Sequence, residues 1–500
     1  MKITPYVFEA YLKCQTKCWL LATNEPPVAI SYPTWVKAQN DAYCTTQIER
    51  LIAESPNSEV ARSPAVENIK AEKWRLAIDL FAHKRNLESS IQAVERIPSA
   101  GRGQSAKFIP IRYVFTNKIS RDEKLLLAFD ASVLSEVLGH KVGIGKIIHG
   151  DDRVTLKVKA SALAGEVLKI TGKIATLLSQ PSPPDLVLNP HCAECQFQTP
   201  CRQMAIDKDD LSLLSGMTEK ERKSFNSKGI FTVTQLSYTF RPRRRPKRLA
   251  AKSEKYHHSL KALAIRQHKV HFVGSHELAI NGVPVYLDVE GLPDRESYYL
   301  IGLRVKTANG IVQHSLWADS AAEERRIWHE FLEILSGIDS PILIHYGSYE
   351  TIFLRRMRER YGGPPVGSLV EKVLASPLNI LSYIYARIYF PTYANGLKDR
   401  AKFLGFEWTA TNASGAQAVV WRSEWENSRE TQKKHSLINY NAEDCEALQL
   451  VTEFVSRPLA LSAGHAEQEV TDIVNVESLP LPSRLNNLET SSFNFQNLKQ

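Results

Sequence analysis

Three cysteines lie close together in the stretch HCAECQFQTPC at residues 191–201. Cys192, Cys195 and Cys201 have the spacing C-x2-C-x5-C. Thiolates are common ligands of zinc and of iron-sulphur clusters, and a site held by cysteine alone needs four of them. The spacing therefore predicts a metal site whose fourth ligand lies elsewhere in the sequence.

Carboxylates in the second half of the chain form another candidate site. In VPVYLDVEG the apolar and polar residues alternate, so Asp288 and Glu290 should lie on one face of a strand, roughly 7 Å apart. Two acids on a covered strand repel each other unless a divalent cation lies between them, and Mg2+ and Mn2+ prefer hard oxygen ligands. A solvent-facing acidic edge would show the same pattern, so further acids must decide between the two interpretations.

Two such acids are present. Asp444 lies in a predicted helix, INYNAEDCEALQLVTEF, and Tyr440 lies four residues earlier on the same helical face. Glu350 begins a predicted helix directly after the apolar strand PILIHYG. A strand, a helix start and a late helix are three separate sources of oxygen ligands, which favours a cation site over an acidic edge.

The composition predicts a globular protein of two to four domains. The chain has 500 residues, 43% of them hydrophobic, with no stretch that reads as a signal peptide or a membrane span. The seven cysteines cluster instead of forming a disulfide framework, so we expect reduced thiols, metal ligation and a cytoplasmic location. A net charge of +9 favours a polyanionic partner.

The elements of the first domain should run to about residue 206. The pattern predicts a helix over 71–96, a strand over 107–118 and then a helix, because Ser120 and Glu123 have capping-box spacing before a long apolar periodic run. Two strands and a helix over 161–180 lead to the cysteine cluster. This mixture indicates an α/β domain.

A small helical module is predicted at 207–268. Two short helices surround KGIFT, a turn that can present backbone N–H groups to a phosphate, as in helix-hairpin-helix modules. A basic run then follows, which is either a proline-stiffened linker or a contact to nucleic-acid phosphates. Its basic residues are Arg241, Arg243, Arg244, Arg245, Lys247 and Arg248.

The order of elements over 269–456 is that of a ribonuclease H-like α/β domain, and the polar tail 457–500 is expected to be disordered. The motifs of this domain resemble those of the DEDD 3′ to 5′ exonucleases, specifically the YprB-type ribonuclease H-like branch. Asp288 and Glu290 match its D-x-E element, and Tyr440 and Asp444 match its Y-x3-D element. At the middle element, N-x3-(F/Y)-D, the chain instead has His345, Tyr349 and Glu350.

This resemblance implies two Mg2+ or Mn2+ ions held by Asp288, Glu290, Glu350 and Asp444, with Tyr440 orienting the attacking water. Glu350 departs from the family's aspartate, because glutamate keeps the charge but reaches farther. The implied reaction is hydrolysis of a nucleic acid from its 3′ end, with single-stranded DNA favoured and RNA also open.

The N-terminal half resembles a second family, the RecB-like nucleases that carry an iron-sulphur cluster. In that family one cysteine lies near the N-terminus, and LKCQTKCWL supplies a matching segment. The resemblance implies that Cys14 completes a four-iron, four-sulphur (4Fe-4S) cluster with Cys192, Cys195 and Cys201, although Cys18 could compete. Spacing alone leaves Zn2+ as the alternative.

The active site of that second family is not evident in the sequence. A PD-(D/E)xK site needs an acid and a lysine two residues apart on a strand, but Arg112 and Val114 stand at those places, and only Glu95 is a candidate for the upstream acid. Asp122 and Lys124 spell D-x-K, but at a helix start, where capping is the better interpretation. The sequence therefore predicts a first domain without a complete nuclease site.

The resulting hypothesis is an α/β protein with an N-terminal PD-(D/E)xK-like (RecB-type) domain and a C-terminal ribonuclease H-like exonuclease domain, joined by the small helical module. Two alternatives remain open. One is a nuclease that acts through the N-terminal domain, and the other is a non-catalytic nucleic-acid-binding or scaffold protein in which His345 and Glu350 mark a decayed site.

Overall fold

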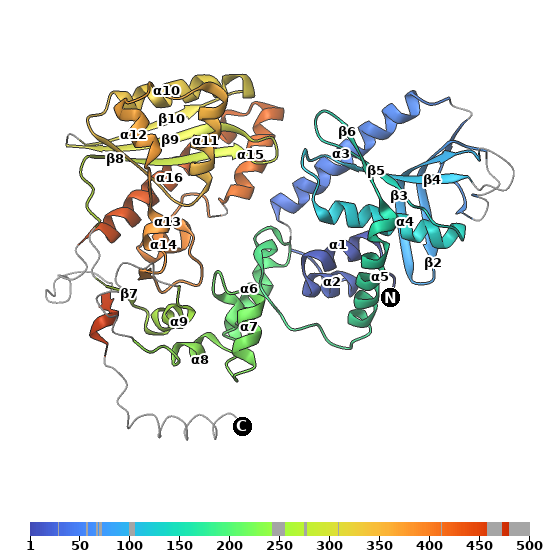
Figure 1. Ribbon diagram of the computed structural model, residues 1–500, viewed down its shortest axis with the longest axis horizontal. Coiled ribbons are helices and arrows are strands. Elements are labelled where there is room, and N and C mark those ends of the chain that lie inside the picture. Colours follow the sequence, from blue (N-terminus) through green and yellow to red (C-terminus); the bar gives the residue numbers. More distant parts are fainter. Residues whose placement is uncertain are drawn as a thin grey trace. The chain divides into compact units, whose positions relative to one another are not determined.

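A computed structural model describes residues 1–28, 30–56, 59–66, 69, 73–99, 106–242, 256–274, 278–308, 310–411, 413–457 and 473–479. The chain divides into two compact units, Met1–Gln203 and Met204–Gln500. Each is an α/β structure built around its own mixed sheet (Figure 1). None of the helices in the described segments is long and apolar enough to cross a membrane.

The sheet of the first unit has six strands in sequential order. Strands β2, β3 and β4 form an antiparallel meander, and helix α4 then carries the chain to β5, which is parallel to β4. The capping box predicted at Ser120 and Glu123 is present at the start of α4. The main elements are α1 (Pro5–Lys13), α2 (Gln15–Ala22), α3 (Ser31–Ala53), β1 (Val60–Arg62), β2 (Leu76–Lys84), β3 (Leu87–Ile97), β4 (Lys107–Val114), α4 (Arg121–Leu138), β5 (Gly145–His149), β6 (Val154–Val158) and α5 (Ala160–Leu178).

The helix predicted over 71–96 is wrong, because residues 76–96 of this segment form the β2–β3 hairpin. Toward the end of β2 buried and exposed residues alternate, since Leu80 and Ala82 are buried and Phe81 between them is exposed. The turn uses Arg85, which adopts a left-handed φ of 56° that ends a strand and that no helix interior would accept. The spacing of the apolar residues suited a helix as well as a strand, and the pairing of β3 with β4 favours the strand.

The sheet of the second unit has five strands in the order β10-β9-β8-β11-β12. The central strand β8 is antiparallel to β9 and parallel to β11, so its backbone is paired on both sides. Helix α16 packs on β8 and β9, and α11 packs on β8. These elements are β8 (Val283–Leu292), β9 (Ser297–Thr307), β10 (Gly310–Trp317), α10 (Glu324–Ser336), β11 (Pro341–His345), α11 (Tyr349–Tyr361), α12 (Leu369–Ala375), β12 (Leu378–Asn379), α14 (Leu397–Phe403), α15 (Gly415–Ser428) and α16 (Thr431–Ser456).

The helical segment predicted as a separate module at 207–268 belongs to the second unit. Its helices α7 (Glu219–Asn226), α8 (Val233–Ser237) and α9 (His258–Gln267) share a small core against Tyr393. Lys261, which is 1% exposed, donates from Nζ to the carbonyl oxygen of Phe390 at 2.9 Å. The segment therefore packs into the fold that carries the carboxylates instead of linking two domains.

Part of the tail predicted to be disordered is ordered. Within 457–500 the structure describes 473–479, where β14 (Ile473–Asn475) pairs in parallel with β7 (Val270–Phe272). The isoleucine and valine of this short stretch suit a strand, and the neighbouring polar residues concealed that signal in the sequence.

Candidate metal centre

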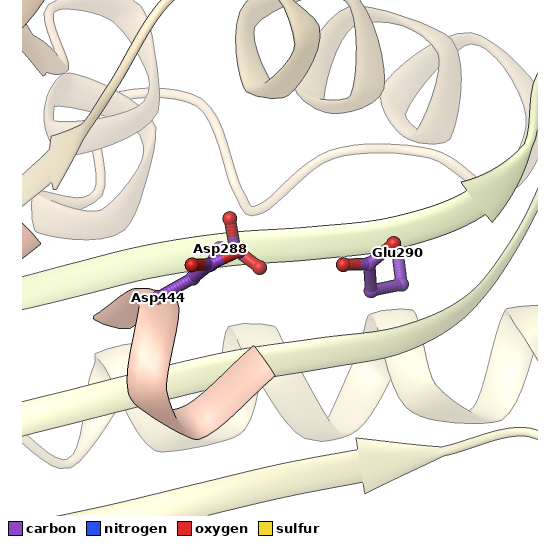
Figure 2. A group of neighbouring side chains, drawn as sticks. All are labelled: Asp288, Glu290 and Asp444. Atoms are coloured by element: carbon purple, nitrogen blue, oxygen red, sulfur yellow. The ribbon is translucent and has the colours of Figure 1, made fainter. Parts of the chain in front are cut away.

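Three carboxylates meet at the central strand of the second sheet. Asp288 and Glu290 come from β8, and Asp444 comes from α16 (Figure 2). One oxygen from each lies within 4.8 Å of the other two, closer than the spacing along the strand alone predicts. No other group of three metal-ligating side chains is this close within the described part of the chain.

These acids lie in the interior of the fold, with Asp288 half-buried, and no described cation bonds to them. Glu290 is 9% exposed and Asp444 is 7% exposed, and none of the three forms an ion pair with a described residue. Burial raises the pKa of Asp288 and of Glu290 well above the usual range, and repulsion from Asp444 raises both further. Burial likewise raises the pKa of Asp444 to about 6. A bound divalent cation would relieve both effects.

Hydrogen bonds from neighbouring side chains restrict the orientation of two of the three carboxylates. Asn441 donates from Nδ2 to Oδ2 of Asp288 at 2.6 Å, and Trp408 donates from Nε1 to Oδ1 of Asp444 at 2.8 Å. Tyr440 also donates to Asp444, and burial raises the pKa of Tyr440 far above its usual value. The phenol therefore keeps its proton.

Lys398 lies beside the triad without bonding to it. Its Nζ is 4.4 Å from the centre of the Tyr440 ring and donates to the carbonyl oxygen of Ala413. Burial lowers the pKa of Lys398, although the charges of Asp444 and Glu290 act in the opposite direction. A half-buried lysine at this position can meet a phosphate oxygen.

Glu350 lies near the triad but outside the group of three. Its charge raises the pKa of Asp288 and of Glu290, while burial has the larger effect on both. Glu350 is 5% exposed, and its Oε2 lies 3.6 Å from Nδ1 of His345, which is 1% exposed. Neither atom has a hydrogen-bond partner among the described residues. Buried polar atoms of this kind ordinarily have a water or an ion as partner.

The first unit brings together the four cysteines expected from the sequence. Cys14 lies between α1 and α2, Cys192 lies in a 3-10 turn (Pro190–Glu194), and Cys201 lies in α6 (Gln198–Asp207). Burial raises the pKa of Cys201 to about 11, and the charges of Cys14, Cys195 and Cys192 contribute to this rise. A hydrogen bond of 3.1 Å from Asn189 Nδ2 to the carbonyl oxygen of Lys13 joins the two ends of the unit.

Cys18, the competing ligand, differs from Cys14 in its surroundings. Cys18 is fully buried in the hydrophobic core, whereas Cys14 is half-buried. Burial and the charge of Cys14 raise the pKa of Cys18, but the charges that act on Cys192 and Cys201 come from Cys14 and the other cysteines of the cluster.

Arg112 and Glu95, the residues compared above with a PD-(D/E)xK site, both form internal ion pairs. Arg112 of β4 contacts Asp130 of α4 at 3.1 Å, and Ser89 donates to the same carboxylate at 2.6 Å. Glu95 of β3 pairs with Lys146 of β5. These acids already have cationic partners, so they have little need of a metal.

Two other features singled out in the sequence are Asp122 and the basic run that begins at Arg241. Asp122 lies in the first turn of α4 and accepts from Lys13 at 2.6 Å, in accordance with the capping interpretation. Arg241 is exposed and donates to the carbonyl oxygen of Tyr238. The other basic residues of that run, Arg243, Arg244, Arg245, Lys247 and Arg248, lie outside the described residues.

Sequence reasoning missed several neighbours of the acids. Asn441 and Trp408 bond directly to the carboxylates, and Lys398 lies beside them. Asn441 follows Tyr440 immediately in the sequence, but nothing in the local sequence predicts its bond to Asp288, which is 153 residues away in the chain. Asp130 was missed in the first unit, because only its packing against β4 identifies it as the partner of Arg112.

Residues 285–456 match a family model of the RNase H superfamily. The match begins in β8 and ends with α16, and so it includes all three acids of the triad. The C-terminal part of the chain is therefore ribonuclease H-like, a class of domain whose members are generally nucleases that use divalent metals. A comparison with curated proteins found no match.

Proposed function

We propose that this protein is a metal-dependent 3′ to 5′ exonuclease of the DEDD type that acts on single-stranded nucleic acid, with DNA favoured over RNA. The observation that supports this most directly is the cluster of Asp288, Glu290 and Asp444, three carboxylates to which no described cation bonds, although the charge of Lys398 acts on Glu290 and Asp444. A ribonuclease H-like domain that retains three such acids fits two-metal hydrolysis of a phosphodiester. The end polarity follows from the resemblance to the DEDD family.

In this mechanism, two Mg2+ or Mn2+ ions would supply a nucleophilic water and stabilise charge on the leaving 3′ oxygen. Asp288, Glu290 and Asp444 would hold a metal ion through their carboxylate oxygens, and Glu350, whose Oε2 has no hydrogen-bond partner among the described residues, would contribute a further ligand.

The chain's own groups would position the substrate and the water. Tyr440 keeps its proton, so it can both anchor to Asp444 and orient the attacking water by a hydrogen bond. Lys398 offers a positive charge to a non-bridging phosphate oxygen on the side of the Tyr440 ring. No step requires an ionised tyrosine.

For the first unit we propose a RecB-type fold that has lost its nuclease site. The support for this proposal is the cysteine pattern that carries the resemblance and the mixed α/β structure of the unit. The ion pairs of Arg112 with Asp130 and of Glu95 with Lys146 support the loss of the site, because the positions compared with the family's catalytic groups already have partners. This unit would then handle nucleic acid and hold a metal group.

A 4Fe-4S cluster is the group that we propose for Cys14, Cys192, Cys195 and Cys201. The charges of Cys14, Cys195 and Cys192 act on the pKa of Cys201, which supports one shared site, and the resemblance to the RecB-like nucleases favours a cluster over Zn2+. Its role would be structural, joining the start of the unit to its end. All seven cysteines are free thiols, which favours the reducing cytoplasm.

The first experiment is digestion of 5′-labelled single-stranded DNA and RNA by anaerobically purified protein with Mn2+, beside Asp288→Ala. We expect a ladder that shortens from the 3′ end and disappears in the variant. Cleavage by both proteins would place the activity in the first unit. No cleavage by either would support the binding or scaffold protein, with Glu350 and His345 as signs of decay.

The cluster has its own experiment. Anaerobic protein should be brown, and iron and sulphide analysis should give about four of each per chain. Cys14→Ser should lose the colour, whereas the matched variant Cys18→Ser should keep it, because Cys18 lies in the core. A colourless protein with one zinc per chain would overturn the assignment.

A further inference from the structure

The carboxylate of Asp288 is held by an amide from the opposite helix. Asn441 is fully buried in α16, and its Nδ2 donates both to Oδ2 of Asp288, at 2.6 Å, and to the backbone oxygen of Asp288, at 3.1 Å. Two bonds from one amide to one residue fix both the side chain and the strand that carries it. The second oxygen of Asp288 remains free of this contact.

The close approach of Asn441 depends on a glycine. Gly302 of β9 is the cross-strand neighbour of Asp288, in ordinary strand conformation. A Cβ at Gly302 would lie 2.0 Å from Oδ1 of Asn441 and 3.0 Å from Sγ of Cys445. The missing side chain therefore makes the space in which the amide reaches Asp288.

We propose that Asn441 is a positioning residue for the metal ligand Asp288, and that Gly302 is required because only glycine leaves room for it. The inference rests on the proposed function, since it assigns the geometry of the same metal site. Asn441 fixes one oxygen of Asp288 in the hydrogen bond and so sets the orientation of the carboxylate that lies beside Glu290 and Asp444.

The chemistry of an amide suits this position. A lysine would neutralise the triad and compete with the cation, and an aspartate would repel Asp288. An asparagine donates hydrogen bonds without carrying charge, so the site keeps its full attraction for a divalent ion. Hydrogen-bond partners of metal ligands commonly contribute 10–100-fold to metal affinity, and we expect an effect of that size here.

The test measures Mn2+ binding to the full-length protein without substrate, by the electron paramagnetic resonance signal of free Mn2+. Wild type, Asp288→Ala, Asn441→Ala and Gly302→Ala are titrated at 25 °C, after their unfolding midpoints have been measured. Asn441→Ala and Gly302→Ala should each bind Mn2+ about 10–100-fold more weakly. Gly337→Ala is the matched control, because a Cβ there meets no atom closer than 3.6 Å.

The double variant Gly302→Ala/Asn441→Ala separates positioning from general damage. If Gly302 acts by making room for Asn441, removing the asparagine takes away the two nearest atoms and leaves Cys445 Sγ, at 3.0 Å, as the next contact of the new methyl group. The double variant should then bind Mn2+ about as well as Asn441→Ala alone. Full additivity of the two losses would overturn the proposed link. If Gly302→Ala does not fold, Asn441→Ala still tests the positioning role.

The outcomes distinguish this inference from the proposed function. If Asp288→Ala loses Mn2+ while Asn441→Ala binds it like wild type, the positioning role is wrong and the metal site stands. A lower unfolding midpoint with unchanged Mn2+ affinity would likewise show a purely structural asparagine. If Asp288→Ala binds Mn2+ as tightly as wild type, the metal site itself is wrong.

Discussion

Both sheets of this protein have acidic side chains packed on or beside them, but the charges of these acids are balanced in different ways. In the first unit the buried Asp130 is paired with Arg112, and the half-buried Glu95 is paired with Lys146. In the second unit Asp288, Glu290 and Asp444 face one another with no bonded cation among the described residues. Acids alone do not indicate a metal site. A cluster of acids with no bonded cation does, because an external cation is then needed to offset their mutual repulsion.

The largest expected effect is on activity. Asp444→Asn removes one charge without changing shape, so the triad loses a metal ligand and the cleavage rate should fall on the order of a thousandfold or more. Glu95→Gln is the matched change in the first sheet and should leave the rate within about twofold, because that acid serves an ion pair. The measurement is the initial rate of release from a labelled single strand. Equal losses in both variants would contradict the distinction between the sheets.

The second prediction concerns stability. Arg112→Met leaves the buried Asp130 without its cation and should lower the free energy of unfolding by about 3–5 kcal/mol, seen as a lower urea midpoint. Adding Asp130→Leu should restore most of that loss, because the uncompensated charge is gone. A double variant as unstable as the single one would show that the pair is not the reason for the effect.

The third prediction concerns pH. The carboxylates of the triad have raised pKa values in the folded protein, so the metal-free fold binds protons more tightly than the unfolded chain does. Their contribution to stability is therefore complete below about pH 4 and is lost as the pH rises through about 6 and above.

Metal binding should show the opposite trend. With a pKa of about 6, Asp444 is about one-tenth ionised at pH 5 and about nine-tenths ionised at pH 7, so Mn2+ affinity should rise about tenfold from this group alone. Calorimetric titrations at both pH values measure it. Mn2+ affinity that does not change with pH would indicate that the triad is already ionised without metal.

The smallest effect is expected at Glu350, which lies outside the group of three. Glu350→Gln keeps the shape and should reduce the cleavage rate about tenfold while Mn2+ still binds to the triad. Comparing the Mn2+ dependence of the rate in this variant and in wild type measures the second ion. A loss as large as that of Asp444→Asn would make Glu350 an equal member of the site.

Short-range patterns in the sequence determined several features. Alternation along VPVYLDVEG placed Asp288 and Glu290 on one face, because side chains of a strand point to opposite sides in turn. The capping box at Ser120 was also correct, since its bonds join residues three apart. The ribonuclease H-like order of elements was evident for the same reason, because each element carried its own periodicity.

Only the tertiary structure decided what depends on residues far apart in the chain. The segment predicted as a helix over 71–96 contains the β2–β3 hairpin instead. The spacing of its apolar residues suited a helix as well as a strand, and pairing of β3 with β4 favours the strand. The pairing of Arg112 with Asp130 and the reach of Asn441 past Gly302 to Asp288 follow from how helices pack on sheets. The sequence shows which residues could bind a metal ion. Whether a cationic side chain bonds to each acid depends on how the elements pack, and the acids without such a bond are the ones that need a metal ion.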